Sequence, residues 1–186
     1  DVPFFRFIKE SINDYSDDKN YLATADVNGI HIVGDGTRYS FVSKPSRAQK
    51  QPVVNSVWFA RMKDSYKILC FSEANRELAR DSVISSGFAG FEALNSSLPY
   101  LFQVISSREF EEKKNLYATG ATQISLNNQS LSNIKVLTPD TKLIKEFSDS
   151  TGAMLDQIIT LQMVNRKLQS QRKMLMSKLL FEQLEV

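Results

Sequence analysis

The sequence has little of what catalysis or metal binding requires. It contains one cysteine, Cys70, and one histidine, His31. A single cysteine cannot form a disulfide within the chain and fits a reducing compartment such as the cytoplasm. A single histidine without a cysteine cluster argues against a transition-metal site, and neither residue lies in a nucleophile-and-base pattern. We therefore expect no catalytic residues, no metal and no cofactor on this chain.

Phosphate-binding loops and long apolar runs are also missing. None of the seven glycines falls in a GxGxxG or GxxxxGK pattern. No stretch approaches the roughly eighteen apolar residues of a membrane span. The first ten residues lack the basic-then-apolar pattern of a secretion signal. The sequence predicts a cytoplasmic protein with no membrane segment.

Charge is concentrated although the net charge is only +2. Residues 38–67 contain seven basic side chains against one acidic residue, Asp64, and we call this set the basic strip. Its members are Arg38, Lys44, Arg47, Lys50, Arg61, Lys63 and Lys67. Such a strip can supply the phosphate contacts of a nucleic-acid binder, although a solvated strand face would look the same.

Short apolar runs separated by turn residues dominate the first two-thirds of the chain. We expect a helix at 3–8, strands at 21–27, 30–33, 39–42, 53–62 and 66–71, and turns at 28–29, 34–36 and 63–65. Trp58 and Phe59 should be core residues, not platforms for stacking bases. These patterns predict a strand-rich α+β domain.

Helical patterns follow. We expect helices at 98–105 and 110–116, a loop with a short strand at 120–126, and a closing strand at 134–137. Thr138, Pro139 and Asp140 predict a helix start, with a threonine cap and an early proline. The predicted division is a globular domain at 1–138 and a long helix at 139–186, which at about 1.5 Å per residue would extend on the order of 70 Å.

The terminal segment has coiled-coil spacing, with seam residues alternately four and three positions apart. The seam comprises Met154, Ile158, Leu161, Asn165, Leu168, Arg172, Leu175 and Leu179. Its polar members, Asn165 and Arg172, would fix the register. Further apolar residues such as Leu155 and Ile159 predict more than one neighbour, for example a second copy and another subunit. A helix folded against its own domain is the alternative.

Several segments carry a family resemblance through their order and spacing. They are 21–27 (YLATADV), 44–48 (KPSRA), 57–63 (VWFARMK), 85–91 (SSGFAGF), 120–126 (GATQISL), 131–139 and the terminal helix. In this order the chain resembles the specificity subunit of type I restriction-modification enzymes, over essentially its whole length. It resembles one target recognition domain with one conserved helix.

The resemblance implies a non-catalytic reader of double-stranded DNA. Specificity subunits usually carry two such domains, each reading one half of a split site, and their two helices pair antiparallel. Adenine methylation and cleavage belong to separate modification (methyltransferase) and restriction subunits, with S-adenosylmethionine on the modification subunit. The chain would be a half-subunit acting as an antiparallel homodimer, or the second half of a longer chain.

Candidate DNA contacts come from the basic strip and the polar loop. They are Lys44, Arg47, Gln49, Lys50, Gly120, Thr122 and Gln123. Arginine and lysine suit the major-groove edge of guanine and glutamine suits adenine, while Gly120 would allow close backbone approach. The alternative function is a coiled-coil assembly adaptor whose head binds protein and not DNA. Charges scattered over the surface, instead of gathered on one face, would favour that adaptor.

Overall fold

The globular part is built around β7 (Ser56–Ala60), whose five residues are all buried. The computed structural model describes residues 3–34, 36–121 and 124–182, with side chains described up to residue 180. In the first sheet the strand order is β1-β10-β7-β8 and all neighbours are antiparallel. The other strands are β1 (Phe5–Phe7), β8 (Ile68–Phe71) and β10 (Phe88–Ala93).

A second four-stranded sheet has the order β5-β2-β9-β6. Its strands are β2 (Lys19–Leu22), β5 (Thr37–Tyr39), β6 (Ala48–Lys50) and β9 (Ser82–Ser85). Only β2 and β9 run parallel, and their connection includes the first sheet's β7 and β8. A small third sheet joins β3 (Val27–Asn28) to β4 (His31–Ile32) through Gly29, which has a φ of 56°.

Side-chain alternation along β7 divides the interior into two cores. Val57 and Phe59 point to a core that includes the helices, whereas Trp58 and Ala60 point to a core shared with the second sheet. Gly90 lies opposite Trp58 in the register of β7 and β10. A Cβ at Gly90 would lie 2.4 Å from the indole ring, so only glycine leaves room for the tryptophan. The expected core positions of Trp58 and Phe59 are confirmed.

Five helices complete the described fold. They are α1 (Arg76–Asp81), α2 (Leu98–Ser106), α3 (Arg108–Tyr117), α4 (Asn128–Leu131) and α5 (Thr141–Glu182), with 3-10 turns η1 (Thr24–Asp26) and η2 (Glu73–Asn75). Helices α2 to α5 all contribute buried residues to the core that contains Val57 and Phe59. The predicted helices at 98–105 and 110–116 are confirmed as α2 and α3, and the predicted hairpin as β7 and β8. None of these helices is apolar over enough of its length to cross a membrane.

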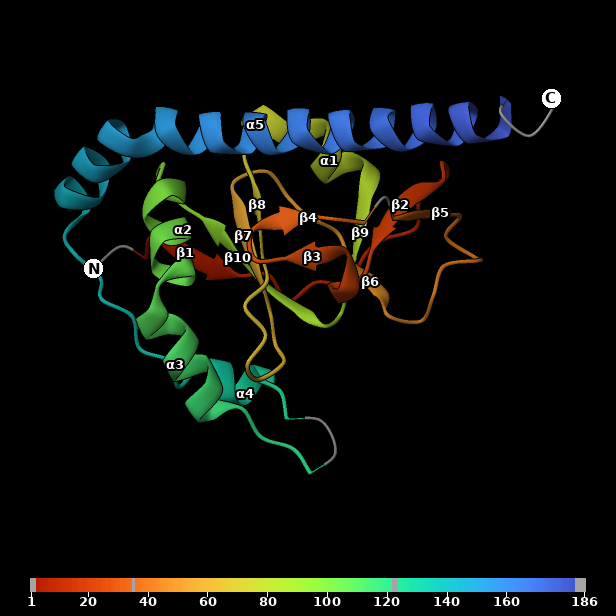
Figure 1. Cartoon of the computed structure of the whole chain (residues 1–186). Coiled ribbons are helices and arrows are strands. Elements are labelled where there is room, and N and C mark those ends of the chain that lie inside the picture. Colours follow the sequence, from red (N-terminus) through yellow and green to blue (C-terminus); the bar gives the residue numbers. More distant parts are fainter. Residues whose placement is uncertain (1–2, 35, 122–123, 183–186) are drawn as a thin grey trace.

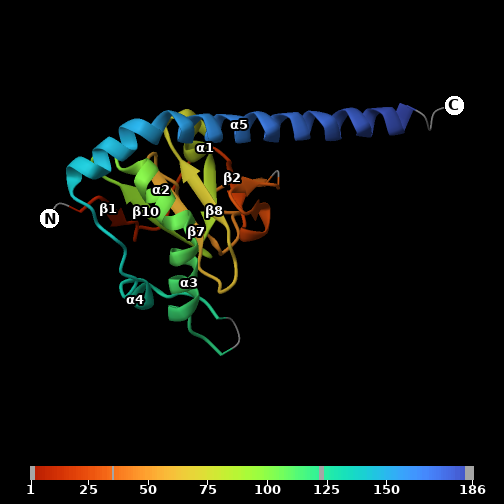
Figure 2. The same cartoon turned by 60° about the vertical axis from the view of Figure 1, so that its left-hand side comes forward.

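The long helix α5 packs on the domain with its first half and extends beyond it with its second half (Figures 1 and 2). On the side facing the domain, α5 buries its own Ile144, Ser148, Leu155 and Ile159, and Pro99 of α2 lies close to Gly152. The same face continues with Gln162 and Arg166. Because this face then offers polar side chains to the domain, the buried apolar contacts of α5 end at Ile159. The predicted class, a strand-rich α+β domain followed by a long helix, is confirmed.

The expected helix at 3–8 is wrong, because the segment forms strand β1. Phe5 and Phe7 pack on Phe91, with ring centroids 4.9 and 5.8 Å apart. Arg6 points the other way and pairs with Glu92, whose Oε2 lies 2.6 Å from its Nε. A cross-strand alternation of period two therefore outweighs the local helical pattern.

Four further local predictions need correction. The strand expected at 21–27 ends at Leu22, because the Asp26 carboxylate accepts the Ala23 N–H at 2.7 Å and closes η1. The hairpin expected at 34–36 is wrong, since β5 pairs with β2. Residues 134–137 form no strand in the described part of the chain. The long helix begins after Asp140, whose carboxylate accepts the Leu143 N–H at 2.8 Å, so Asp140 and not Thr138 is the cap.

Candidate nucleic-acid interface

Arg61 joins three segments that are far apart in sequence. Its guanidinium donates from Nε to the Phe88 carbonyl at 3.2 Å and from Nη1 to the Leu126 carbonyl at 3.1 Å. Its backbone N–H donates to the Gly87 carbonyl at 2.9 Å, and its carbonyl accepts the Leu126 N–H at 2.8 Å. Burial lowers the pKa of this guanidinium. Arg61 is half-buried, and its bonds to the Phe88 and Leu126 carbonyls hold these three segments together.

Further backbone hydrogen bonds connect the segments that lie on either side of Arg61. The Ser86 N–H donates to the Arg47 carbonyl at 2.8 Å, and the Lys63 N–H donates to the Ile124 carbonyl at 3.0 Å. A Cβ at Gly87 would lie 3.3 Å from Nη2 of Arg47, so the Arg47 side chain reaches the β9–β10 turn. We call residues 44–50, 61–65, 85–87 and the described parts of 119–126 the rim.

The rim lies away from α5. In both views the β7–β8 turn and the segment between α3 and α4 project from the side of the domain opposite the long helix (Figures 1 and 2). A ligand bound at this turn would therefore leave the projecting half of α5 accessible.

Helix α3 holds the β7–β8 turn in place. The buried Lys114 ammonium donates to the Ser65 carbonyl at 2.9 Å and lies 2.8 Å from the Glu111 carboxylate. Burial lowers the pKa of Lys114, while Glu111 opposes that shift. Asn115 accepts the Asp64 N–H at 2.9 Å and donates to the Asp64 carboxylate at 3.0 Å. These bonds restrain Asp64, whose φ is 55°, and so fix the backbone beside the exposed Lys63.

The predicted DNA contacts occupy different environments. Arg47 and Gln49 are exposed, and Gln49 donates to the Ser46 carbonyl at 2.7 Å. The Lys44 ammonium lies 5.0 Å from the centre of the Phe41 ring. Gly120 is exposed with a φ of 135°, which favours glycine. Thr122 and Gln123 lie outside the described residues.

Lys50 is more engaged than the others. Its ammonium donates to the carbonyls of Lys9 and Glu10 at 3.0 and 3.1 Å. Burial lowers the pKa of Lys50, and the Arg61 charge adds to that shift. A lysine held by two main-chain carbonyls is less available to a phosphate than an exposed one, so Lys50 serves first to fix the N-terminal segment on β6.

The basic strip thus divides by role. Arg38 pairs with Asp81 at 2.7 Å, and Lys67 donates to the Thr24 carbonyl at 2.7 Å. Arg61 and Lys50 likewise have their side-chain bonds within the protein, although they lie in the rim segments. Lys44, Arg47 and Lys63 are the strip residues of the rim that remain for a ligand. Counting charges along the sequence could find the strip but could not separate these two groups. The clamp formed by Lys114 and Asn115 was also missed, because a KKN sequence on a helix gives no sign of a distant turn.

The seam of α5 is exposed along the helix. Met154 is 63% exposed, Leu168 56% and Leu179 57%, and Ile158, Leu161 and Leu175 are also exposed. The off-seam residues Leu155 and Ile159 are buried against the domain. One face of α5 therefore folds onto its own domain, as the alternative from sequence expected, while the seam faces outward and its pairing with a partner helix stays a prediction.

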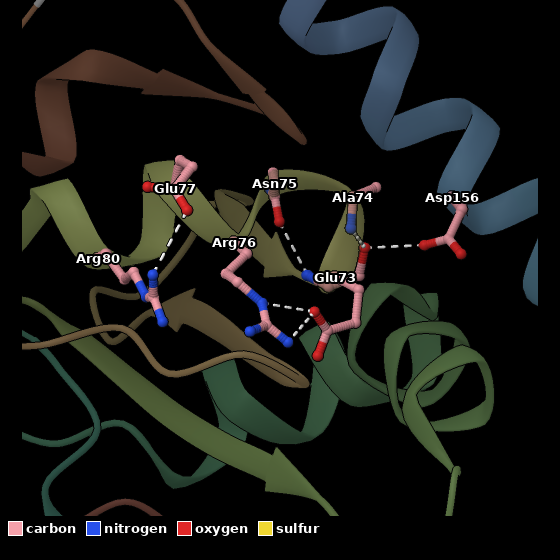
Figure 3. Close-up of polar contacts among 8 residues, drawn as sticks. Glu73, Ala74, Asn75, Arg76, Glu77, Arg80 and Asp156 are labelled. Carbon is pink, nitrogen blue, oxygen red and sulfur yellow. Dashed lines mark hydrogen bonds and ion pairs between the residues drawn. The ribbon is translucent and has the colours of Figure 1, made fainter.

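A polar junction fixes the direction in which α5 leaves the domain (Figure 3). The Ser72 hydroxyl donates to the Asp156 carboxylate at 2.8 Å and accepts the Ala74 N–H at 3.1 Å. The Asn75 side chain accepts the Ser72 N–H at 2.8 Å. The exposed Glu73–Arg76 pair beside it adds little stability, as is usual for surface ion pairs.

No three histidine, cysteine, aspartate or glutamate side chains gather in a metal-binding arrangement among the residues the structure describes. Burial raises the pKa of the Cys70 thiol, and the Asp156 charge adds to the rise. A protonated thiol is a poor nucleophile.

No family model matches the sequence, and no curated protein matches it. By structure the chain is similar to a chain from a study of complex assembly and conformational transition of the type I R-M system, with a TM-score of 0.59, 17% identity, and coverage of 96% of this chain and 49% of that one. It is also similar to the HsdS subunit from Thermoanaerobacter tengcongensis, with a TM-score of 0.57, 16% identity, and coverage of 94% and 48%. The chain spans about half the length of either structure. It therefore has the fold of HsdS subunit structures over that half, which confirms the resemblance at the level of fold.

Proposed function

We propose that this chain is the DNA-recognition half of a type I restriction-modification specificity subunit. In this proposal the globular domain reads one half of a split site in double-stranded DNA. Helix α5 docks the domain to a second recognition unit and to the modification subunit. The chain itself performs no chemistry, and a partner adenine methyltransferase with its S-adenosylmethionine, together with a restriction subunit, acts on the DNA in the cytoplasm.

The arrangement of the rim and α5 is the observation that carries this proposal. A specificity unit must hold DNA and its partner subunits at the same time, so the two surfaces must not overlap. Here the β7–β8 turn of the rim lies opposite α5, whose apolar seam remains exposed (Figure 1). The likeness to HsdS and type I R-M structures supports the same division between a reading domain and a docking helix.

The rim has the chemistry for reading a duplex. Arg47 and Lys63 are exposed and can reach phosphates or guanine edges, and Lys44 lies on the same segment as Arg47. Thr122 and Gln123 remain proposed base contacts on the neighbouring segment. Flipping of the target base would take place in the catalytic subunit, so the rim needs no enclosed pocket.

The test is selection from a random pool of duplexes by the complex of this chain with its modification subunit. We expect one half-site sequence to be enriched, and we expect affinity to fall steeply with salt because phosphate contacts release counterions. A complex that binds all duplexes equally would contradict the proposal and leave the protein-binding adaptor as the better account.

A further inference from the structure

The positive charge of this protein is concentrated on the half of α5 that projects from the domain. Residues 157–181 contain five basic and no acidic side chains, so the other residues carry eighteen basic against twenty-one acidic side chains. The five are Arg166, Lys167, Arg172, Lys173 and Lys178. We call residues 162–181 the overhang, because the buried contacts of α5 with the domain end at Ile159.

One of these cations lies within the apolar seam. Arg172 occupies a seam position between Leu168 and Leu175, and all three side chains are exposed. Any helix that covers Leu168 and Leu175 must also cover Arg172. A guanidinium taken from water without a counter-charge is strongly unfavourable, so the covering helix must bring a carboxylate. Lys178 is next to the seam residue Leu179, so a carboxylate on the covering helix would pair with it at the edge of the contact.

The helix itself does not supply that carboxylate. The acidic residues nearest to Arg172 along α5 are Asp156 and Glu182, and even the nearer, Glu182, is about 15 Å away along the axis at about 1.5 Å per residue. In a second copy, Asp156 accepts a hydrogen bond from Ser72, and Asp149 pairs with Lys145 at 2.6 Å. Asp156 lies two positions from the seam residues on either side of it, on the face turned away from the seam, and Asp149 lies five residues before the first seam residue, Met154. Two copies of the overhang would also place five cations beside five.

We infer that the overhang binds an acidic amphipathic helix of another polypeptide, with carboxylates flanking an apolar stripe. This inference rests on the proposed function only in that the partner belongs to the same assembly. Leu168 and Leu175 pack on the partner's apolar stripe, Arg172 pairs with a carboxylate inside the contact, and the exposed Lys167 and Lys178 add long-range attraction. A duplex fits the overhang less well, because a phosphate backbone leaves the exposed leucines uncovered.

Synthetic helical peptides test the inference on the full chain. One peptide carries a leucine seam flanked by glutamates, and matched peptides carry lysines or glutamines in the flanks. We expect the glutamate peptide to bind at least about tenfold more tightly than the lysine peptide at low salt, measured by fluorescence anisotropy. The preference should shrink near 1 M salt, where the screening length falls to about 3 Å.

Charge reversal supplies the matched variants. Arg172→Glu should largely abolish the preference for the glutamate peptide over the lysine peptide, because a carboxylate of the partner would then meet a carboxylate at the seam. Lys142→Glu, on the half of α5 that lies over the domain, should leave the preference unchanged. Both residues are exposed, so neither change is expected to unfold the domain.

Three outcomes would overturn the inference. Equal binding of all peptides would remove the role of charge. A chain that sediments as a dimer without peptide, and that Leu168→Glu dissociates, would show that a second copy covers the overhang. Displacement of the glutamate peptide by a mixed-sequence duplex would show a nucleic-acid partner. In each case the duplex selection described above decides separately whether the rim reads DNA.

Discussion

Arg61 and Arg47 come from the same basic stretch, and the fold uses their guanidinium groups differently. The Arg61 guanidinium donates hydrogen bonds to main-chain carbonyls of two other segments, whereas Arg47 is exposed at the β9–β10 turn. Burial explains the difference, because a buried guanidinium must have its donors satisfied inside the protein. The hydrogen bonds of individual residues therefore distinguish side chains that hold the rim together from side chains that can touch a ligand.

Arg47→Ala should weaken binding of the selected duplex by about 1–3 kcal/mol if the guanidinium contacts a base. A phosphate contact would instead weaken all duplexes similarly and lower the salt slope by about one. Fluorescence anisotropy across a salt series distinguishes these cases. Arg76→Ala is the matched control, since Arg76 is exposed near α5 and pairs with Glu73 (Figure 3). Unchanged binding by Arg47→Ala would remove this residue from the interface.

Gly90→Ala should destabilise the domain because the added Cβ would lie 2.4 Å from the Trp58 ring. Overpacking of this kind costs about 1–3 kcal/mol of the free energy of unfolding. Gly152→Ala is the contrasting variant, since its Cβ would meet only Pro99 at 3.9 Å and alanine favours helix by up to about 1 kcal/mol. Urea denaturation of both variants checks the pair, and a neutral Gly90→Ala would contradict the packing described for β7 and β10.

At the scale of elements, sequence periodicity identified the long elements and misjudged the short ones. The seam of α5 and the hairpin of β7 and β8 were predictable because each pattern extends over many residues. Strand β1 was not, because its alternation of Phe5, Arg6 and Phe7 only becomes visible once β10 lies beside it. The pairing of β5 with β2 likewise depends on a partner far away in sequence.

Asn115→Ala should loosen the β7–β8 turn, because it removes both hydrogen bonds to Asp64. We expect hydrogen exchange at the Asp64 amide to accelerate by about tenfold or more, as for local opening, with little change in global stability. Glu112→Ala on the same helix is a control, since its side chain is exposed and pairs with Arg108. Equal exchange in the wild type and Asn115→Ala would show that the turn does not depend on this clamp.

Leu161→Glu combined with Leu168→Glu should prevent assembly with partner helices while leaving the domain folded. Both side chains are exposed, so the charge affects only a surface that a partner covers. Size-exclusion chromatography of the chain mixed with its modification subunit measures the loss. Ser177→Glu, exposed and off the seam, is the matched control. An unchanged elution position of the double variant would show that the seam is not the docking contact.

At the scale of the whole molecule, the sequence predicted a head on a long helix, and the fold adds the direction of each surface. Residues 38–67 could be recognised as basic, yet only the fold shows that Arg38 and Lys67 are engaged internally while Arg47 and Lys63 lie along the rim. Which residues meet at a rim depends on tertiary contacts, so sequence counting cannot supply it.

The most direct test of the central claim is hydrogen–deuterium exchange on the assembled complex, with and without its selected duplex. We expect DNA-dependent protection at residues 44–47, 61–65 and 119–125, and DNA-independent protection along the seam of α5. Protection by DNA that falls on α5, and leaves the rim unchanged, would contradict the separation of reading and docking surfaces.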